Sequence, residues 1–245
     1  ISGVLCLMYA WKILPILRLT RKNIKMDPEI AKLILIYGLP TGLQMGIISI
    51  SDMTLQAVVN TYETALVVAY GICKKVEGLG WQIADAIGTS LGTFVGQNIG
   101  AGKIDRVKKG VNYGYLLNLL CYGVFCPIVL IYSQSIMKAF TEDPASIRYG
   151  MEYMRIFTGF FFFGGFLGIY HNVLRSAGDV KVTILMGLSE VITRIGFSFL
   201  FNEWFGYYGL WWVSPITWCC ATMVGAVRYY SGTWQNKARI QKKEG

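Results

Sequence analysis

Residues 65–109 read ALVVAYGICKKVEGLGWQIADAIGTSLGTFVGQNIGAGKIDRVKK. The stretch starts as an apolar helix pattern, contains no proline and ends in a basic loop. Small residues recur at every fourth position: Gly80, Ala84, Gly88, Gly92, Gly96 and Gly100. Each step of four overshoots one helical turn by about 40°, so these residues form a ridge that winds around the helix. Glycine this dense weakens a helix in water by about 1 kcal/mol per position relative to alanine. In lipid the backbone N–H and C=O groups must hydrogen-bond to each other, which favours the helix, and small residues let neighbouring helices approach closely. We therefore expect a membrane helix that either packs tightly or slides against its neighbours.

Composition extends this prediction to the whole chain. Of the 245 residues, 54% are hydrophobic and 15% are charged, whereas soluble domains average about 25% charged residues. The apolar residues form blocks that approach or exceed the about 20 residues needed to cross a bilayer. These blocks are 1–17, 33–60, 65–97, 111–132, 147–173, 182–201 and 207–230. The expected fold class is all-α: a polytopic helical membrane protein with a six-helix lobe and the end of a preceding helix.

The net charge of +9 does not indicate nucleic-acid binding, because the basic residues gather in alternate loops. One set of loops and the tail contain Arg18, Arg21, Lys22, Lys25, Lys32, Lys103, Arg106, Lys108, Lys109, Arg175, Lys181, Arg228, Lys237, Arg239, Lys242 and Lys243. The other loops contain only Lys138 and Arg148. The positive-inside rule places the basic loops in the cytoplasm. We expect a multi-pass protein of the cell (inner or plasma) membrane with a cytoplasmic C-terminus and no nucleic-acid partner.

The same pattern suggests the domain organisation. Residues 1–17 form the end of one helix, 18–32 a basic cytoplasmic linker, 33–230 the six-helix lobe and 231–245 a basic cytoplasmic tail. The first block starts abruptly at Ile1, without the basic leader of a signal peptide. We therefore expect the chain to begin inside a helix of a longer protein. Asp27-Pro28-Glu29 and Thr141-Glu-Asp-Pro144 are typical helix starts.

Metal and redox sites are not expected. The six cysteines lie in apolar blocks without the paired spacing of a zinc or redox site. The chain has one histidine, His171, which we interpret as an interfacial or helix-end residue, with proton shuttling as the alternative. We predict free thiols and no metal or cofactor.

A polar ridge follows the basic linker. Gln44, Asp52, Gln56 and Asn60 stand at multiples of four, interrupted only by Ile48. On a membrane helix such a ridge must face protein or a water-filled cavity. A carboxylate at the bilayer centre costs roughly 2.5–3.5 kcal/mol on insertion scales, so Asp52 needs water, a proton or a partner. We favour a functional role for Asp52 over a structural partner or a shallow, wetted position.

Other charges lie inside the apolar blocks. Lys74 and Glu77 stand three apart and could form an ion pair. Asp85 has no local partner and is a secondary candidate for a functional site. Glu190 and Arg194 stand four apart on one helix face in the favourable order. We favour a locked structural pair there, with a gate or a substrate contact as the alternative.

Five motifs in order resemble one known family. They are GLPTGLQ at 38–44, VAYGICKKVEG at 68–78, VGQNIGAGKIDRVKKG at 95–110, LRSAGDVK at 174–181 and GLWWVSPITW at 209–218. They are similar to motifs in the C-terminal half of the multidrug and toxic compound extrusion (MATE) transporters. The resemblance covers nearly the whole chain.

This resemblance implies specific expectations. The family has twelve helices in two six-helix lobes and exports organic cations and other amphipathic compounds in exchange for Na+ or H+. Residues 1–17 would then end the sixth helix, and 33–230 would form helices seven to twelve. The N-terminal lobe of the same protein would be the missing partner. One branch of the family uses an acidic residue on the seventh helix, at the position of Ile48, one turn before Asp52.

The sequence therefore predicts the C-terminal lobe of an antiporter rather than an enzyme. Its ligands would be small-molecule drugs or organic cations, and it would use no cofactor beyond the coupling ion. The candidate binding residues are Gln44, Asp52, Gln56, Asn60, Asp85, Glu190 and Arg194. The alternatives are a truncated fragment without transport activity and a lipid-linked sugar flippase, which would need a more basic cavity. A membrane-embedded enzyme is disfavoured, because no catalytic cluster is recognisable in the sequence.

Overall fold

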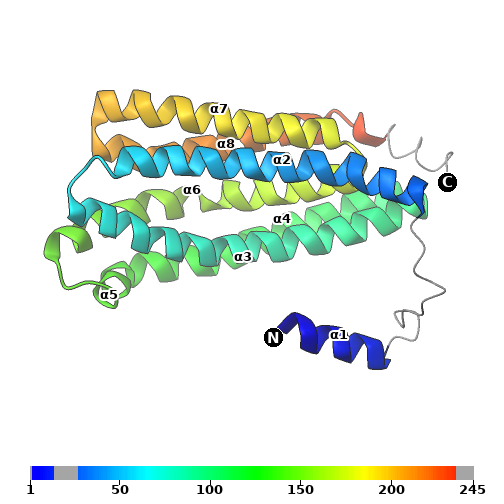
Figure 1. Ribbon diagram of the computed structural model, residues 1–245, viewed down its shortest axis with the longest axis horizontal. Helices are drawn as coiled ribbons and strands as arrows, with labels where there is room; N and C mark the ends of the chain where they lie inside the picture. The colour runs from blue at the N-terminus through cyan, green and yellow to red at the C-terminus, as the bar shows by residue number, and fades with distance from the viewer. Residues whose placement is uncertain (1, 14–26, 236–245) are drawn as a thin grey trace. The chain divides into compact units, whose positions relative to one another are not determined.

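The computed structural model describes residues 2–13 and 27–235, and these are helical with no strand among them. The helices are α1 (Ser2–Ile13), α2 (Pro28–Val59), α3 (Thr64–Gly100), α4 (Ile104–Ile131), α5 (Ser133–Lys138), α6 (Pro144–Ser176), α7 (Val180–Phe205) and α8 (Tyr207–Tyr230). Figure 1 shows α2, α3, α4, α6, α7 and α8 as long helices and α5 as a short one. The predicted all-α fold class is confirmed.

The chain divides into two compact units, Ile1–Pro40 and Thr41–Gly245. The first contains α1 and the beginning of α2. Most of the predicted linker (18–32) and of the predicted tail (231–245) lies outside the described residues. The proposed domain boundaries therefore stay predictions. Helix α2 starts at Pro28, where a side-chain oxygen of Asp27 accepts the backbone N–H of Glu29 at 2.9 Å, as the predicted helix start requires.

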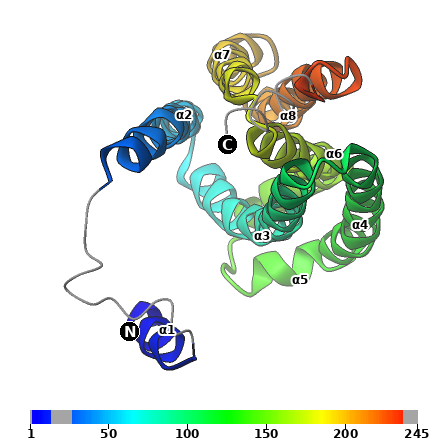
Figure 2. The same cartoon turned by 90° about the vertical axis from the view of Figure 1, so that its right-hand side faces the viewer.

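Helix α6 lies at the centre of the second unit and contacts α3, α4, α5, α7 and α8. Helix α3 packs along α6 and α4, and α7 pairs with α8. Figure 2 shows α3 and α6 in the middle, with α4 and α5 on one side and α7 and α8 on the other. Aromatic side chains fill the centre, including the fully buried Tyr153, Phe157, Phe161, Trp211 and Trp218.

The glycine ridge of α3 explains its close approach to α6. A side chain at Gly88 would press against Asn172 and the backbone oxygen of Gly168, and one at Gly92 would meet Ser176. Gly96 and Gly100, by contrast, have open space around them. The first part of the ridge therefore packs tightly against α6. Its last residues no longer face α6, because the ridge winds around the helix.

Helix α6 starts as its sequence predicts. Asp143 is the N-cap, and its carboxylate accepts the backbone N–H of Ser146 at 2.9 Å and the Ser146 hydroxyl at 2.6 Å. These hydrogen bonds stabilise the charged carboxylate and hold the pKa of Asp143 below its usual range. The bond from the Ser146 hydroxyl has the larger effect, and the bond from the Ser146 backbone N–H adds to it. Proline at the next position suits the first turn.

Four described helices, α4, α6, α7 and α8, are long and apolar enough to cross a membrane. Large apolar side chains also cover outward faces, for example Leu116, Leu120 and Val124 on α4. Apolar faces this extensive are unusual in soluble proteins and match a lipid-facing surface.

Candidate functional site

A cavity of about 700 Å³ lies in the second unit and is lined by residues of α2, α3, α6, α7 and α8. We call it the central cavity. Most of the residues that line it are charged or polar, and the indole rings of Trp81 and Trp218 also line it. The ionisable residues in its wall are Asp52, Lys74, Glu77, Asp85, His171, Arg175, Glu190 and Arg194.

Arg194 joins two carboxylates in the cavity wall. Its Nη1 lies 2.6 Å from Oδ1 of Asp52, and its Nη2 lies 2.7 Å from Oε1 of Glu190. The side chains of Arg194 and Glu190 are only 3% and 7% exposed, whereas that of Asp52 is 43% exposed. Asp52 is therefore the end of this cluster that water, ions and ligands in the cavity can reach. We call these three residues the carboxylate–arginine triad.

The predicted Glu190–Arg194 pair is thus present, but it is part of a larger cluster. Sequence spacing could place these two residues on one face of α7. It could not show that Asp52, on a helix 142 residues earlier, completes the cluster. Ser51 lies next to it, with its Oγ 3.5 Å from Nη1 of Arg194.

A second cluster surrounds Glu77, which is 2% exposed. One carboxylate oxygen accepts from Lys74 Nζ at 2.9 Å and from Trp81 Nε1 at 3.3 Å, and the other accepts from the hydroxyl of Tyr153 at 2.7 Å. The Lys74–Glu77 pairing expected from the sequence is present. Tyr153 comes from α6, so no local pattern pointed to it.

The polar ridge of α2 does not face one way. Gln44 is buried and donates its amide to the backbone oxygen of Thr183 at 2.8 Å, with His171 Nε2 at 3.4 Å. Gln56 donates to the side-chain oxygen of Asn60 at 2.7 Å, and neither is among the described residues that line the central cavity. Because each step of four adds about 40°, Gln44 and Asn60 point in nearly opposite directions.

Of the seven candidate residues, four line the cavity. These are Asp52, Asp85, Glu190 and Arg194. Gln44 lies beside it through its contact with His171, and Gln56 and Asn60 lie near the end of α2. The structure therefore gathers the charged candidates and separates the amide ones.

Sequence reasoning missed one wall of the cavity. His171, Asn172 and Arg175 of α6 line it, although we interpreted His171 as an interfacial residue. The available signal was their spacing. His171 follows Gly168 by three residues and Arg175 follows His171 by four, so both lie on the face of α6 that contacts α3.

Trp81 and Trp218 meet edge to face at 5.7 Å between ring centroids.

The wall carries four carboxylates against three lysine and arginine side chains. Asp52 and Asp85 are its accessible anionic groups, while Glu77 and Glu190 are buried. A cation attracted by Asp52 or Asp85 could also contact an indole face, which stabilises organic cations by about 0.5–2 kcal/mol. The cavity can therefore hold an amphipathic cation or a small inorganic ion.

The sequence model of the MatE family matches residues 40–200 of the chain. The chain belongs to the MatE family. The similarity to MATE motifs inferred from the sequence is thereby confirmed, and family membership points to a transporter rather than an enzyme. The matched residues run from the middle of α2 to α7 and include Asp52, Glu190 and Arg194.

The chain is also similar to proteins that are named as probable multidrug resistance proteins. The chain is 27% identical over 208 residues to the probable multidrug resistance protein YpnP of Bacillus subtilis, covering 84% of this chain and 47% of that protein. It is 23% identical over 220 residues to the probable multidrug resistance protein NorM of Thermotoga maritima, covering 86% and 46%. The chain thus spans about half the length of these relatives.

Among solved structures, the Vibrio cholerae MATE transporter VcmN superposes with a TM-score of 0.83 and 16% identity, covering 94% of this chain and 53% of that one. The MATE fold of this multi-pass membrane protein is therefore shown by structure as well as by sequence.

Proposed function

We propose that this chain is the C-terminal lobe of a multidrug efflux antiporter, which exchanges organic cations or other amphipathic compounds for Na+ or H+. The observation that carries the proposal is the accessible carboxylate of Asp52 in the central cavity, held by the buried Arg194. The names of relatives such as YpnP and NorM support multidrug extrusion. Coverage of about half of each relative supports a missing N-terminal lobe.

The triad suggests how exchange would be coupled. A proton or Na+ at Asp52 neutralises its charge and weakens its attraction to Arg194, which keeps its bond to Glu190. A cationic drug competes for the same carboxylate. Because the two ligands exclude each other there, binding of one lowers the affinity for the other, and this reciprocal coupling is the thermodynamic basis of antiport.

The contact between Asp52 and Arg194 also connects α2 with α7. Among the described residues, α2 and the turn after it meet α7 through polar contacts at three levels: Gln44 with Thr183, Asp52 and the neighbouring Ser51 with Arg194, and Tyr62 with Asn202 at 2.6 Å. The Asp52–Arg194 contact lies at the middle level and is the ionic one among them. Loading Asp52 would therefore loosen the centre of the α2–α7 contact, which gives the ion a route to conformational change.

The charge of the cavity favours this function over a lipid-linked sugar flippase. A flippase would need cationic side chains in excess to hold a pyrophosphate group, whereas carboxylates are in excess here. In the proposed orientation the basic loops, the linker 18–32 and the C-terminal tail lie in the cytoplasm.

Asp52→Asn tests the proposal in the protein joined to its N-terminal lobe. Ethidium efflux from vesicles, with Na+ and H+ gradients imposed separately, is expected to fall by at least about tenfold and to lose its response to the coupling ion. Asp105→Asn, which removes an exposed carboxylate in the first turn of α4, should leave both unchanged. Wild-type efflux and ion response in the Asp52→Asn protein would show that the triad has no coupling role. Absence of efflux in the unmodified protein joined to its N-terminal lobe would contradict the proposed transport activity itself.

A further inference from the structure

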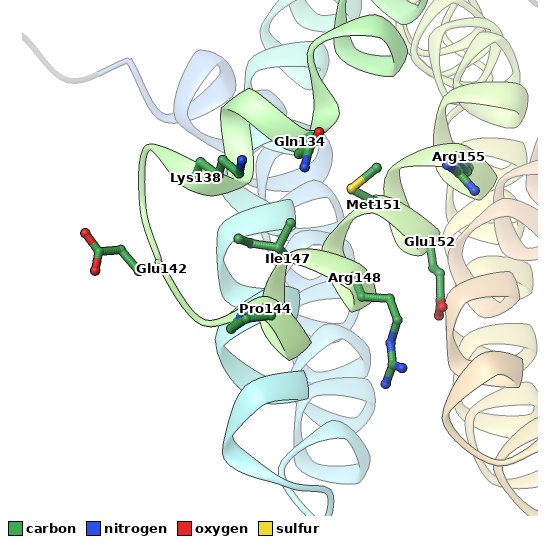
Figure 3. A pocket seen from close by; sticks show the side chains of 9 residues that line it. All are labelled: Gln134, Lys138, Glu142, Pro144, Ile147, Arg148, Met151, Glu152 and Arg155. Carbon is green, nitrogen blue, oxygen red and sulfur yellow. The ribbon is translucent and has the colours of Figure 1, made fainter.

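A second cavity, of about 420 Å³, lies where α5 meets α6. We call it the α5–α6 groove (Figure 3). Its lining combines the cationic side chains of Lys138, Arg148 and Arg155 with the apolar Ile147 and Met151. Figure 3 shows Ile147 and Met151 lying between Lys138 on one side and the two arginines on the other. The groove is thus an apolar floor with a cationic rim.

Within the described residues, none of the three cations is held by a carboxylate in an ion pair, although the Arg148 guanidinium lies over the Tyr149 ring at 5.0 Å from its centroid. All three residues are exposed. Two carboxylates also line the groove, so the rim keeps a net positive charge. In Figure 3, Glu142 projects away from the groove and Glu152 extends to the side opposite Lys138.

The position of the groove along α6 indicates the membrane interface. Arg155 is the last charged residue before 156–170, a run without any charge. Arg148 lies seven residues earlier, on the same face and about 10.5 Å away along the helix axis. Exposed arginine at the edge of an apolar run extends its guanidinium toward the phosphate layer of the bilayer. The two loop cations on this side of the proposed topology, Lys138 and Arg148, are both in the groove.

The groove is separate from the central cavity. Figure 2 places α4 and α5 on the far side of α3 and α6 from α7, and the two cavities share no lining residue among those described. A role for the groove therefore does not depend on the transport mechanism proposed above.

We propose that the α5–α6 groove binds an anionic glycerophospholipid, with its phosphate at Arg148 and Arg155, Lys138 adding charge, and the start of an acyl chain along Ile147 and Met151. The planar guanidinium matches a phosphate geometrically. The apolar floor and the interfacial depth favour a lipid over free phosphate, which would gain nothing from Ile147 or Met151.

Native mass spectrometry of the 245-residue chain in detergent tests this, with phosphatidylglycerol and phosphatidylcholine of identical acyl chains in equal amounts. Each surface cation contributes attraction to anionic lipid, so phosphatidylglycerol is expected to be retained about tenfold or more over phosphatidylcholine. The K138Q/R148Q/R155Q variant should lose this preference, and R148K/R155K, which keeps the charge but not the planar guanidinium, should keep only part of it. Excess inorganic phosphate should leave the lipid bound.

The matched control is K103Q/R106Q/K108Q, which removes equal charge from the α3–α4 turn and the first turns of α4. It should keep most of the preference. An equal loss in both triple variants would overturn the proposal in favour of unspecific charge attraction, and displacement by inorganic phosphate would overturn it in favour of a free-phosphate site. The unfolding midpoint of each variant should match wild type because all the substituted side chains are exposed.

Discussion

Replacing Arg194 with methionine is expected to lower the free energy of unfolding by roughly 3–5 kcal/mol. The substitution removes the only cation bonded to Glu190 among the described residues, and Glu190 is 7% exposed. A buried carboxylate without a cation keeps its desolvation cost and loses its compensating attraction. Chemical unfolding of the 245-residue chain in detergent, followed by tryptophan fluorescence, measures the change.

A second substitution separates the charge from the packing. Glu190→Gln added to Arg194→Met removes the stranded carboxylate, and we expect it to restore most of the lost stability, because neutral pairs of similar volume often replace buried ion pairs without loss. Asp52 needs no such rescue, since its side chain is 43% exposed and water can reach it. If the double variant is no more stable than Arg194→Met, the loss comes from packing and not from the stranded charge.

The contact between Asp179 and Arg228 leads to the second large effect. Asp179 is fully buried in the turn before α7, Arg228 lies in the last turn of α8 with 28% of its side chain exposed, and the two are 2.6 Å apart. Arg228→Met removes the guanidinium from a buried carboxylate and should cost roughly 3 kcal/mol or more. Asp179→Asn leaves a cation that solvent can reach and should cost only about 1–2 kcal/mol.

The order of these two effects is the test. The same unfolding measurement should find Arg228→Met clearly less stable than Asp179→Asn, because the burial of the two partners is unequal. Lys181→Met, which removes an exposed cation close to Asp179 in sequence, should change stability by less than about 0.5 kcal/mol. Equal losses, or a larger loss in Asp179→Asn, would contradict the assignment of Asp179 as the costly partner.

The helical framework follows from the sequence because it depends on local patterns. Apolar block length, the cap at Asp143 and the proline at Pro28 predict where helices exist and begin. Local ion pairs follow in the same way: Lys74 with Glu77 and Glu190 with Arg194 are each within one turn. What local spacing shows is which side chains share a helix face.

The arrangement of the site depends on contacts between segments that are far apart in the sequence, and the spacing of residues within one helix cannot predict such contacts. Asp52 meets Arg194, and Tyr153 meets Glu77, only after the helices pack. The ridge on α2 illustrates the limit: a period of four looks like one face over two turns, yet it turns through about 160° by Asn60. Gln56 and Asn60 therefore bond to each other and not to the cavity wall.

The proposed function depends on competition between a coupling ion and a drug for Asp52. The most direct test is to measure how the affinity for a drug changes with the concentration of the coupling ion. Ethidium affinity of the purified protein, joined to its N-terminal lobe, should be titrated by fluorescence at several pH values and Na+ concentrations. We expect the affinity to fall about tenfold per tenfold rise in either H+ or Na+ activity over the range where that ion binds. In Asp52→Asn the affinity should be weaker and independent of both. Undiminished dependence on the coupling ion in Asp52→Asn would contradict the account.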